Sequence, residues 1–130
     1  MVMSGNLNDL IGKTVKVISI DNDELDITVT DGEKDYRYGI RHFQDCCESV
    51  SLDSVDGNIH NMIGKKITDA YSMISDLPYE EYSGSGTRSV YRIVAEDDYL
   101  WLEWRGRSNG YYGEGVTFFQ YDDDGSYSRW

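Results

Sequence analysis

Proline, cysteine and long apolar runs are all scarce in this chain of 130 residues. Its one proline is Pro78, and its only cysteines, Cys46 and Cys47, are adjacent, so they cannot staple distant segments. No apolar stretch approaches the roughly 20 residues of a membrane span, and Met1–Leu10 lacks the basic start and apolar core of a signal peptide. We therefore expect reduced thiols, no membrane association and a place in the cytoplasm.

Positive charge and catalytic signatures are scarce as well. The chain has 12 Lys and Arg against 24 Asp and Glu, for a formal net charge of −12 at pH 7. Such a field repels phosphate backbones, so we expect no direct nucleic-acid binding, and a large partner should be basic; the alternative is that the charge only keeps the protein soluble. No Gly-rich phosphate loop, dinucleotide fingerprint, nucleophile elbow or HExxH pattern occurs. We expect neither an enzyme nor a cofactor.

The most informative feature that is present is an internal repeat. Asn6–Val15 (NLNDLIGKTV) reappears as Asn58–Ile67 (NIHNMIGKKI), identical or conservatively changed at most positions. In each copy the asparagine can cap a helical turn, and Gly12 or Gly64 can take the left-handed conformation that ends it. Each copy thus predicts a short helical turn that leads into a strand.

A second pair of similar segments sets the extent of the two copies. Cys47–Leu52 (CESVSL) returns as Gly113–Phe118 (GEGVTF), at a larger offset because the second copy carries an insertion that includes the small residues Ser83–Thr87. We expect this inserted loop to be mobile. The chain is therefore interpreted as one domain, residues 1–130, with pseudo-repeats 6–57 and 58–125 and a loop insertion at about residues 75–89.

Alternating apolar and polar residues predict half-buried strands after each helical turn. Leu25, Ile27 and Val29 share one face of the first such strand. In the second copy, Tyr99–Trp104 carries bulky side chains on both faces, which is typical of a central strand. The predicted fold class is α+β: an internally duplicated unit of a short helical turn followed by antiparallel strands.

The first candidate site is a segment that gathers an imidazole, carboxylates and thiols, His42–Glu48 (HFQDCCE). A zinc site would draw on His42, Cys46, Cys47 and His60, yet adjacent cysteines on an extended chain point opposite ways. A cysteine nucleophile is disfavoured too, because acidic neighbours raise the pKa of the thiol. We therefore assign no metal and no catalytic residue.

Two other interpretations of this segment stay open. In the structural one, His42, Gln44 and Asp45 satisfy backbone groups in a tight crossover, and one of the cysteines is buried. In the functional one, His42 and Asp45 contribute to a ligand-binding site.

The second candidate site is Trp104–Val116 (WRGRSNGYYGEGV). Its Asn-Gly dipeptide is a strong hairpin-turn signal, so one interpretation is a β-turn alone. The other is a cationic and aromatic island in an acidic protein, able to hold a phosphate or carboxylate by forked hydrogen bonds and to stack a ring. The candidate ligand-binding residues are Arg105, Arg107, Ser108, Asn109, Tyr111 and Tyr112, joined by His42 and Asp45 if the two loops meet.

Four stretches of the chain resemble a family of small bacteriophage proteins that carries the domain-of-unknown-function label DUF7448. The resemblance covers nearly the whole domain, apart from the Ser83–Thr87 insertion and the Asp122–Trp130 tail. It implies a phage origin and a location in the host cytoplasm, and it assigns no catalytic residue. The stretches are Leu10–Lys13 (LIGK), His42–Val50 (HFQDCCESV), Asp56-Gly57 with Met62–Gly64, and Trp104–Tyr112 (WRGRSNGYY).

These features lead to two hypotheses of function. The first is a non-enzymatic phage accessory protein that counters host defence as an acidic inhibitor, or nucleic-acid mimic, of a host protein with a basic surface. The second is a binding protein that sequesters a small anionic nucleotide signal. A continuous acidic face favours the first, and a pocket with an arginine inside an acidic shell favours the second. The oligomeric state stays open, a homodimer included.

Overall fold

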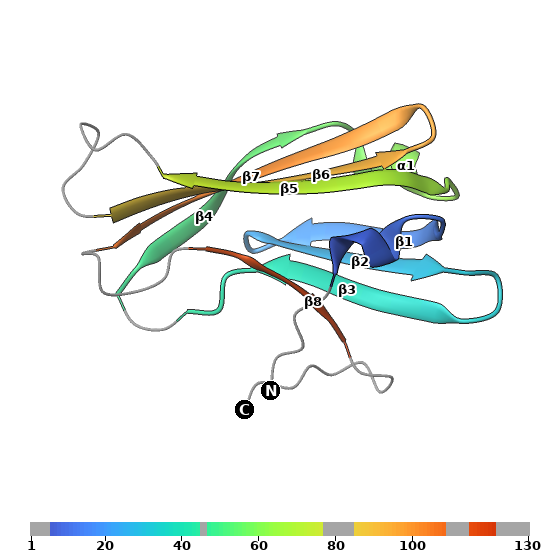
Figure 1. Ribbon diagram of the computed structural model, residues 1–130, viewed down its shortest axis with the longest axis horizontal. Helices are drawn as coiled ribbons and strands as arrows, with labels where there is room; N and C mark the ends of the chain where they lie inside the picture. The colour runs from blue at the N-terminus through green and yellow to red at the C-terminus, as the bar shows by residue number, and fades with distance from the viewer. Residues whose placement is uncertain (1–5, 45–46, 77–84, 109–114, 122–130) are drawn as a thin grey trace.

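The computed structural model describes residues 6–44, 47–76, 85–108 and 115–121. Two four-stranded antiparallel sheets pack face to face (Figure 1). Sheet A has the order β1-β2-β3-β8, with β1 (Thr14–Asp21), β2 (Glu24–Thr30), β3 (Asp35–Arg41) and β8 (Thr117–Gln120). Sheet B has the order β4-β7-β6-β5, with β4 (Ser49–Asp56), β7 (Asp98–Ser108), β6 (Ser85–Ala95) and β5 (Ile67–Asp76).

The predicted α+β class is wrong, because helix forms no layer of the described structure. Among the described residues, only the two four-residue turns η1 (Leu7–Leu10) and α1 (Ile59–Met62) are helical, and neither is long and apolar enough to cross a membrane. The backbone N–H of the second residue after each cap donates to the Asn6 or Asn58 side chain, at 3.0 and 2.9 Å. Gly12 and Gly64 then take φ of 91° and 86°, so cap and stop lie too close together for more than one turn. The fold is a β-sandwich.

The two copies of the repeat meet and bond to each other reciprocally. Gly12 N–H donates to the Ile67 carbonyl at 2.8 Å, and Gly64 N–H donates to the Val15 carbonyl at the same distance. Val15 N–H donates to the Lys65 carbonyl at 3.0 Å, and Ile67 N–H donates to the Lys13 carbonyl at 2.8 Å. Each bond thus has a counterpart with the two copies exchanged, which is the pattern of a local twofold axis.

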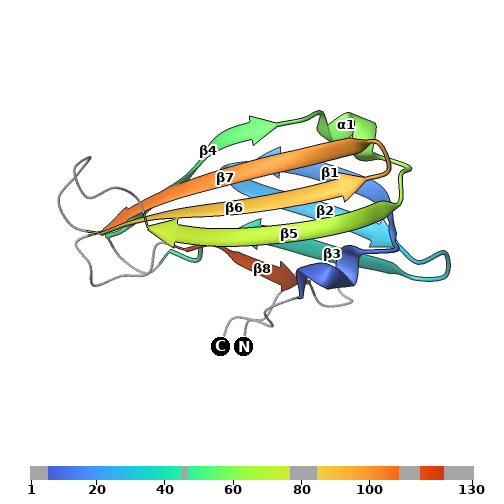
Figure 2. The same ribbon diagram turned by 45° about the horizontal axis from the view of Figure 1, so that its top comes forward.

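Each half of the chain gives its last strand to the other half's sheet. The first three strands of each half form a meander, β1-β2-β3 or β5-β6-β7. β4 then pairs with β7, and β8 pairs with β3. Figure 2 shows β4 running along sheet B and β8 along sheet A. The two halves are therefore interlocked around one core and cannot separate without unpairing both exchanged strands.

The strand register shows that residues of sheet A can be matched one by one with residues of sheet B. Val15 pairs with Val29 and Ile67 pairs with Ala95, and a bulge follows both Val15 and Ile67. Residues of neighbouring strands that face one another form a rung, and rungs can be matched by counting from these bulges. The outer rung Ser19–Asp26–Gly39 of sheet A then matches the outer rung Tyr71–Arg92–Trp101 of sheet B.

The core lies between the sheets. Leu25, Ile27 and Val29 are buried on one face of β2, as their alternation predicts. The prediction of a central strand is confirmed for β7, which lies between β4 and β6 and buries Trp104 against the ring of Tyr91. Part of the loop expected at residues 75–89 is strand, because β5 extends to residue 76 and β6 begins at residue 85. Residues 77–84 of that loop lie outside the described ranges.

Candidate functional site

The crossover from β3 to β4 is held by a buried polar network. The Glu48 side chain is fully buried, and its Oε2 lies 2.7 Å from His42 Nε2. The other ring nitrogen, Nδ1, lies 2.7 Å from the carbonyl oxygen of Gly115. Gln44 Nε2 donates to the Glu48 backbone oxygen at 2.7 Å and to Oε1 at 3.2 Å. Both ring nitrogens of His42 therefore serve the fold, which supports the structural interpretation of this segment.

Of the other candidate metal ligands, the structure describes Cys47 and His60. Cys47 is exposed and disulfide-bonded, so the expectation of reduced thiols is wrong there. His60 is exposed on α1, which lies at the opposite end of the sandwich from the end of β3 (Figure 1). Within the ranges the structure describes, no group of three His, Cys, Asp or Glu side chains could hold a metal ion. Asp45 and Cys46 lie outside those ranges.

One part of the second candidate segment belongs to a strand, and the other part lies outside the described ranges. Arg105, Arg107 and Ser108 belong to the end of β7, and Asn109, Tyr111 and Tyr112 are not among the described residues. Because Leu102 and Trp104 face the core, Arg105 and Arg107 project from the outer face of sheet B. The two candidate segments meet at the hydrogen bond between His42 and Gly115.

The outer face of sheet B carries most of the arginine of the chain. Arg105 faces Arg88 across the β6–β7 ladder, and Trp101 faces Arg92. Arg92 in turn faces Tyr71 on β5, and Tyr71 is 45% exposed. Four of the seven arginines of the chain thus lie on one sheet face of a protein with net charge −12. We call this surface the arginine–aromatic face; its residues are Tyr71, Arg88, Arg92, Tyr99, Trp101, Glu103, Arg105 and Arg107.

A nearly buried carboxylate fixes two of these guanidinium groups. Glu103 is 7% exposed, and its two oxygens contact Arg88 Nη2 at 2.9 Å and Arg105 Nε at 3.0 Å. Arg88, and then Arg105, lowers the pKa of Glu103 by hydrogen bonding to the ionised carboxylate, against the opposing effect of burial. The carboxylate is therefore charged at neutral pH, and it contacts two guanidinium groups.

At the matching positions of sheet A, Arg37 forms an ion pair with Asp26 and also lies over the ring of Tyr121, at 4.0 Å from the centroid. Arg37 donates to both oxygens of Asp26, at 2.9 and 2.7 Å. In sheet B the residue matched to Asp26 is Arg92, which lies over the ring of Tyr99 at 5.9 Å from the centroid. The Tyr99 hydroxyl donates to Asp56 at 2.9 Å, which raises the pKa of the phenol. A carboxylate–guanidinium pair in one sheet corresponds to a guanidinium–aromatic pair in the other.

Six residues of this face were missed by reasoning from the sequence: Tyr71, Arg88, Arg92, Tyr99, Trp101 and Glu103. They come from three strands that are separated along the chain, so no local motif contains them. A usable signal did exist, because Trp101 alternates with the apolar residues of its strand and so faces away from the core.

In class, the protein is an internally duplicated β-sandwich with exchanged final strands and an open arginine–aromatic sheet face. The family model described as Domain of unknown function (DUF7448) matches residues 8–118, and the chain belongs to that family. No curated protein and no solved structure matches the chain.

Proposed function

We propose that this protein is a non-catalytic binding protein that captures a small anionic, ring-bearing ligand of the nucleotide class on the arginine–aromatic face. The observation that supports this most is the rung Tyr71–Arg92–Trp101, where two aromatic side chains flank a guanidinium in a strongly acidic protein. Phosphate oxygens suit guanidinium donors, and a base ring suits exposed aromatic faces.

The geometry favours binding because part of the site is held in place before a ligand arrives. Glu103 holds Arg88 and Arg105 side by side, so little conformational entropy is lost when they contact a phosphate. Arg92 lies on the same face of sheet B as Glu103, on the neighbouring rung. A phosphate bound toward Arg88 and Arg105 leaves Trp101 and Tyr71 for the ring.

The surrounding negative charge makes the site selective. Long-range repulsion disfavours polyanions such as nucleic acid, which must cover much more of the surface than this face. A single small anion meets the local positive charge and is less affected by distant carboxylates, because salt screens charges beyond about 8 Å at physiological ionic strength. In the phage setting that the family resemblance implies, capture of a nucleotide signal would blunt a host defence.

The acidic-mimic hypothesis takes second place. Many carboxylates of the described residues are already engaged within the fold: Asp35 with Lys16, Asp97 and Asp98 with Lys65, and Glu24 with Arg41. Carboxylates that are paired internally contribute less to a surface that imitates phosphates. The clustering of arginines on the arginine–aromatic face, in a chain of net charge −12, supports ligand capture instead.

Isothermal titration with the common ribonucleoside diphosphates tests the proposal. We expect binding by the wild type and a loss of about 1.5–3 kcal/mol of binding free energy in Arg92→Ala, because a charge-assisted contact is removed. Trp101→Ala should weaken nucleotide binding and leave pyrophosphate binding unchanged. Arg37→Ala on sheet A is the matched control and should bind as the wild type does. Absence of binding, or equal binding by Arg92→Ala, would contradict the proposal.

A further inference from the structure

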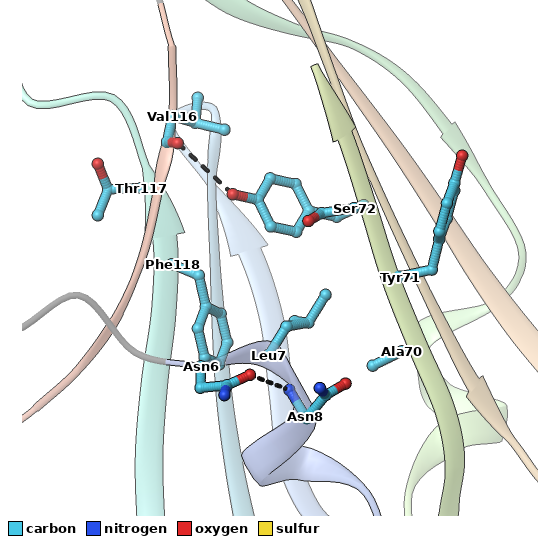
Figure 3. Close-up of a pocket in the computed structure, with 10 residues that line it drawn as sticks. Asn6, Leu7, Asn8, Ala70, Tyr71, Ser72, Val116, Thr117 and Phe118 are labelled. Atoms are coloured by element: carbon cyan, nitrogen blue, oxygen red, sulfur yellow. Dashed lines mark hydrogen bonds between the residues drawn. The ribbon is translucent and has the colours of Figure 1, made fainter.

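A cleft opens between the two sheets on the side where β5 and β8 face each other (Figure 3). Its volume is about 720 Å³, within the range of ligand-binding pockets. Leu7, Tyr91 and Phe118 form its apolar wall, and the Tyr91 hydroxyl approaches the Val116 carbonyl at 3.5 Å at one end. The other polar residues that line it are uncharged: Asn6, Asn8, Tyr71, Ser72 and Thr117.

The cleft exists because the side chains on this side of the sandwich are shorter than the matched side chains that fill the opposite side. Counting from the matched bulges, Ile18 and Ile20 on β1 correspond to Ala70 and Ser72 on β5. Ile18 is 5% exposed and Ile20 packs against the core. Replacing isoleucine by alanine and serine removes several carbons from the space between the sheets. One flank is therefore filled, and its counterpart is open.

The same strand offers unpaired backbone groups along the cleft. Ile67 directs its N–H and carbonyl away from β6, toward Gly12 and Lys13. After the bulge at the next residue, alternation directs the backbone groups of Ala70, Ser72 and Ile74 to that same free edge. Ala70 N–H is taken by the Asp69 carboxylate at 2.9 Å. Within the described ranges, no backbone group outside β6 bonds to Ser72 or Ile74.

We propose that the free edge of β5 and the adjoining cleft together bind an extended peptide segment of a partner protein. The segment pairs with the backbone of β5 around Ser72 and inserts one bulky apolar side chain against Leu7, Tyr91 and Phe118. This is strand addition, in which main-chain bonds supply affinity and a side-chain pocket supplies specificity. The site adjoins the arginine–aromatic face at Tyr71, which also lines the cleft, and peptide pairing does not depend on the proposed nucleotide binding.

Charge complementarity selects the partner. Exposed Asp69 and Asp76 lie toward the two ends of β5, and the strand has no Lys, Arg or Pro to block its edge. A peptide with basic residues on either side of its apolar anchor satisfies both carboxylates. A second copy of this chain does not, because antiparallel pairing of two β5 strands would place Asp69 of one copy toward Asp76 of the other, between molecules of net charge −12.

A displayed library of random peptides, each about ten residues long, tests the proposal against the full chain. The expected winners carry one large apolar residue in an extended, alternating sequence with Lys or Arg on both sides. The best peptide, titrated by calorimetry, should bind about tenfold or more weakly to Ser72→Ile, which fills the cleft as Ile20 does on the other flank. Ser72→Pro, which removes a free-edge N–H and leaves the β6 ladder intact, should weaken it as well.

Thr28→Ile, the same kind of change on the outer face of sheet A, is the control and should leave peptide binding and folding unchanged. Three results would overturn the proposal: no enriched peptide, enriched peptides that bind Ser72→Ile as well as the wild type, or a concentration-dependent dimer that Ser72→Pro abolishes. If Ser72→Pro lowers the melting temperature strongly, Ser72→Ile alone decides.

Discussion

Ser19, Asp26 and Gly39 form one outer rung of sheet A, and the matching rung of sheet B holds Tyr71, Arg92 and Trp101. Small and acidic side chains in one half thus correspond to large aromatic and cationic side chains in the other. On the inner side the difference is reversed, because isoleucines in the first half correspond to alanine and serine in the second.

The shared parts are those that hold the sandwich together. Both halves have the capping asparagine, the glycine with positive φ, the bulge and the reciprocal hydrogen bonds. The differing parts are solvent-facing or line the open flank. We propose that the second half carries the arginine–aromatic face and most of the cleft, to which the first half contributes Asn6, Leu7 and Asn8.

The largest expected effect comes from opening the filled flank. Ile18→Ala should lower the free energy of unfolding by about 2–4 kcal/mol, because the buried side chain leaves a cavity. The matched change Ala70→Ile should alter it by less than about 1 kcal/mol, since the cleft can accept the added carbons. Urea denaturation of both variants measures this, and equal effects would show that the two flanks are packed alike.

A smaller effect is expected where sheet A lacks a side chain on the matched rung. A Cβ at Gly39 would lie 2.5 Å from Cζ of Phe119, a ring that is 1% exposed and packs beside Tyr121. Gly39→Ala should therefore cost about 1–3 kcal/mol of stability through overpacking. Gly115→Ala is the control, because a Cβ there meets nothing within 4 Å. A wild-type melting temperature for Gly39→Ala would show that Phe119 can move aside.

The smallest of the three effects concerns the carboxylate beneath the arginines. Glu103→Gln should cost about 1–2 kcal/mol at neutral pH, since the arginines are partly exposed and keep water as an alternative partner. The folded pKa of Glu103 is lowered from its ordinary 4.5. Its contribution is therefore complete above that value and is lost as the pH falls through the folded pKa.

Stability measured against pH checks this assignment. The wild type should lose stability relative to Glu103→Gln as the pH falls below about 4.5. Parallel curves for the two proteins throughout the acid range would show that Glu103 is not a stabilising carboxylate.

Local features of the fold were predictable from the sequence, and the arrangement of strands in the two sheets was not. The asparagine caps, the alternation of Leu25, Ile27 and Val29, and the central position of β7 follow from residue spacing alone. The α+β class failed because a cap followed so soon by a left-handed glycine permits one turn, which is too short to form a layer. Which sheet accepts β4 or β8 depends on edges that only the assembled meanders create.

The site shows the same division. Arg105 and Arg107 stood out because they are neighbours in a short segment. Arg92 and Tyr71 did not, because strand pairing brings them beside Trp101 from other strands. His42 drew attention as a candidate ligand, yet its two nitrogens satisfy Glu48 and Gly115 in a crossover.

The most direct test of the account compares the two matched rungs in one experiment. Amide resonances of the labelled protein are followed by heteronuclear NMR while adenosine diphosphate is added. We predict that Tyr71, Arg92 and Trp101 shift in a saturable way and that Ser19, Asp26 and Gly39 do not. Shifts confined to the rung of sheet A, or no saturable shift on either rung, would contradict the claim that the second half carries the anion-binding surface.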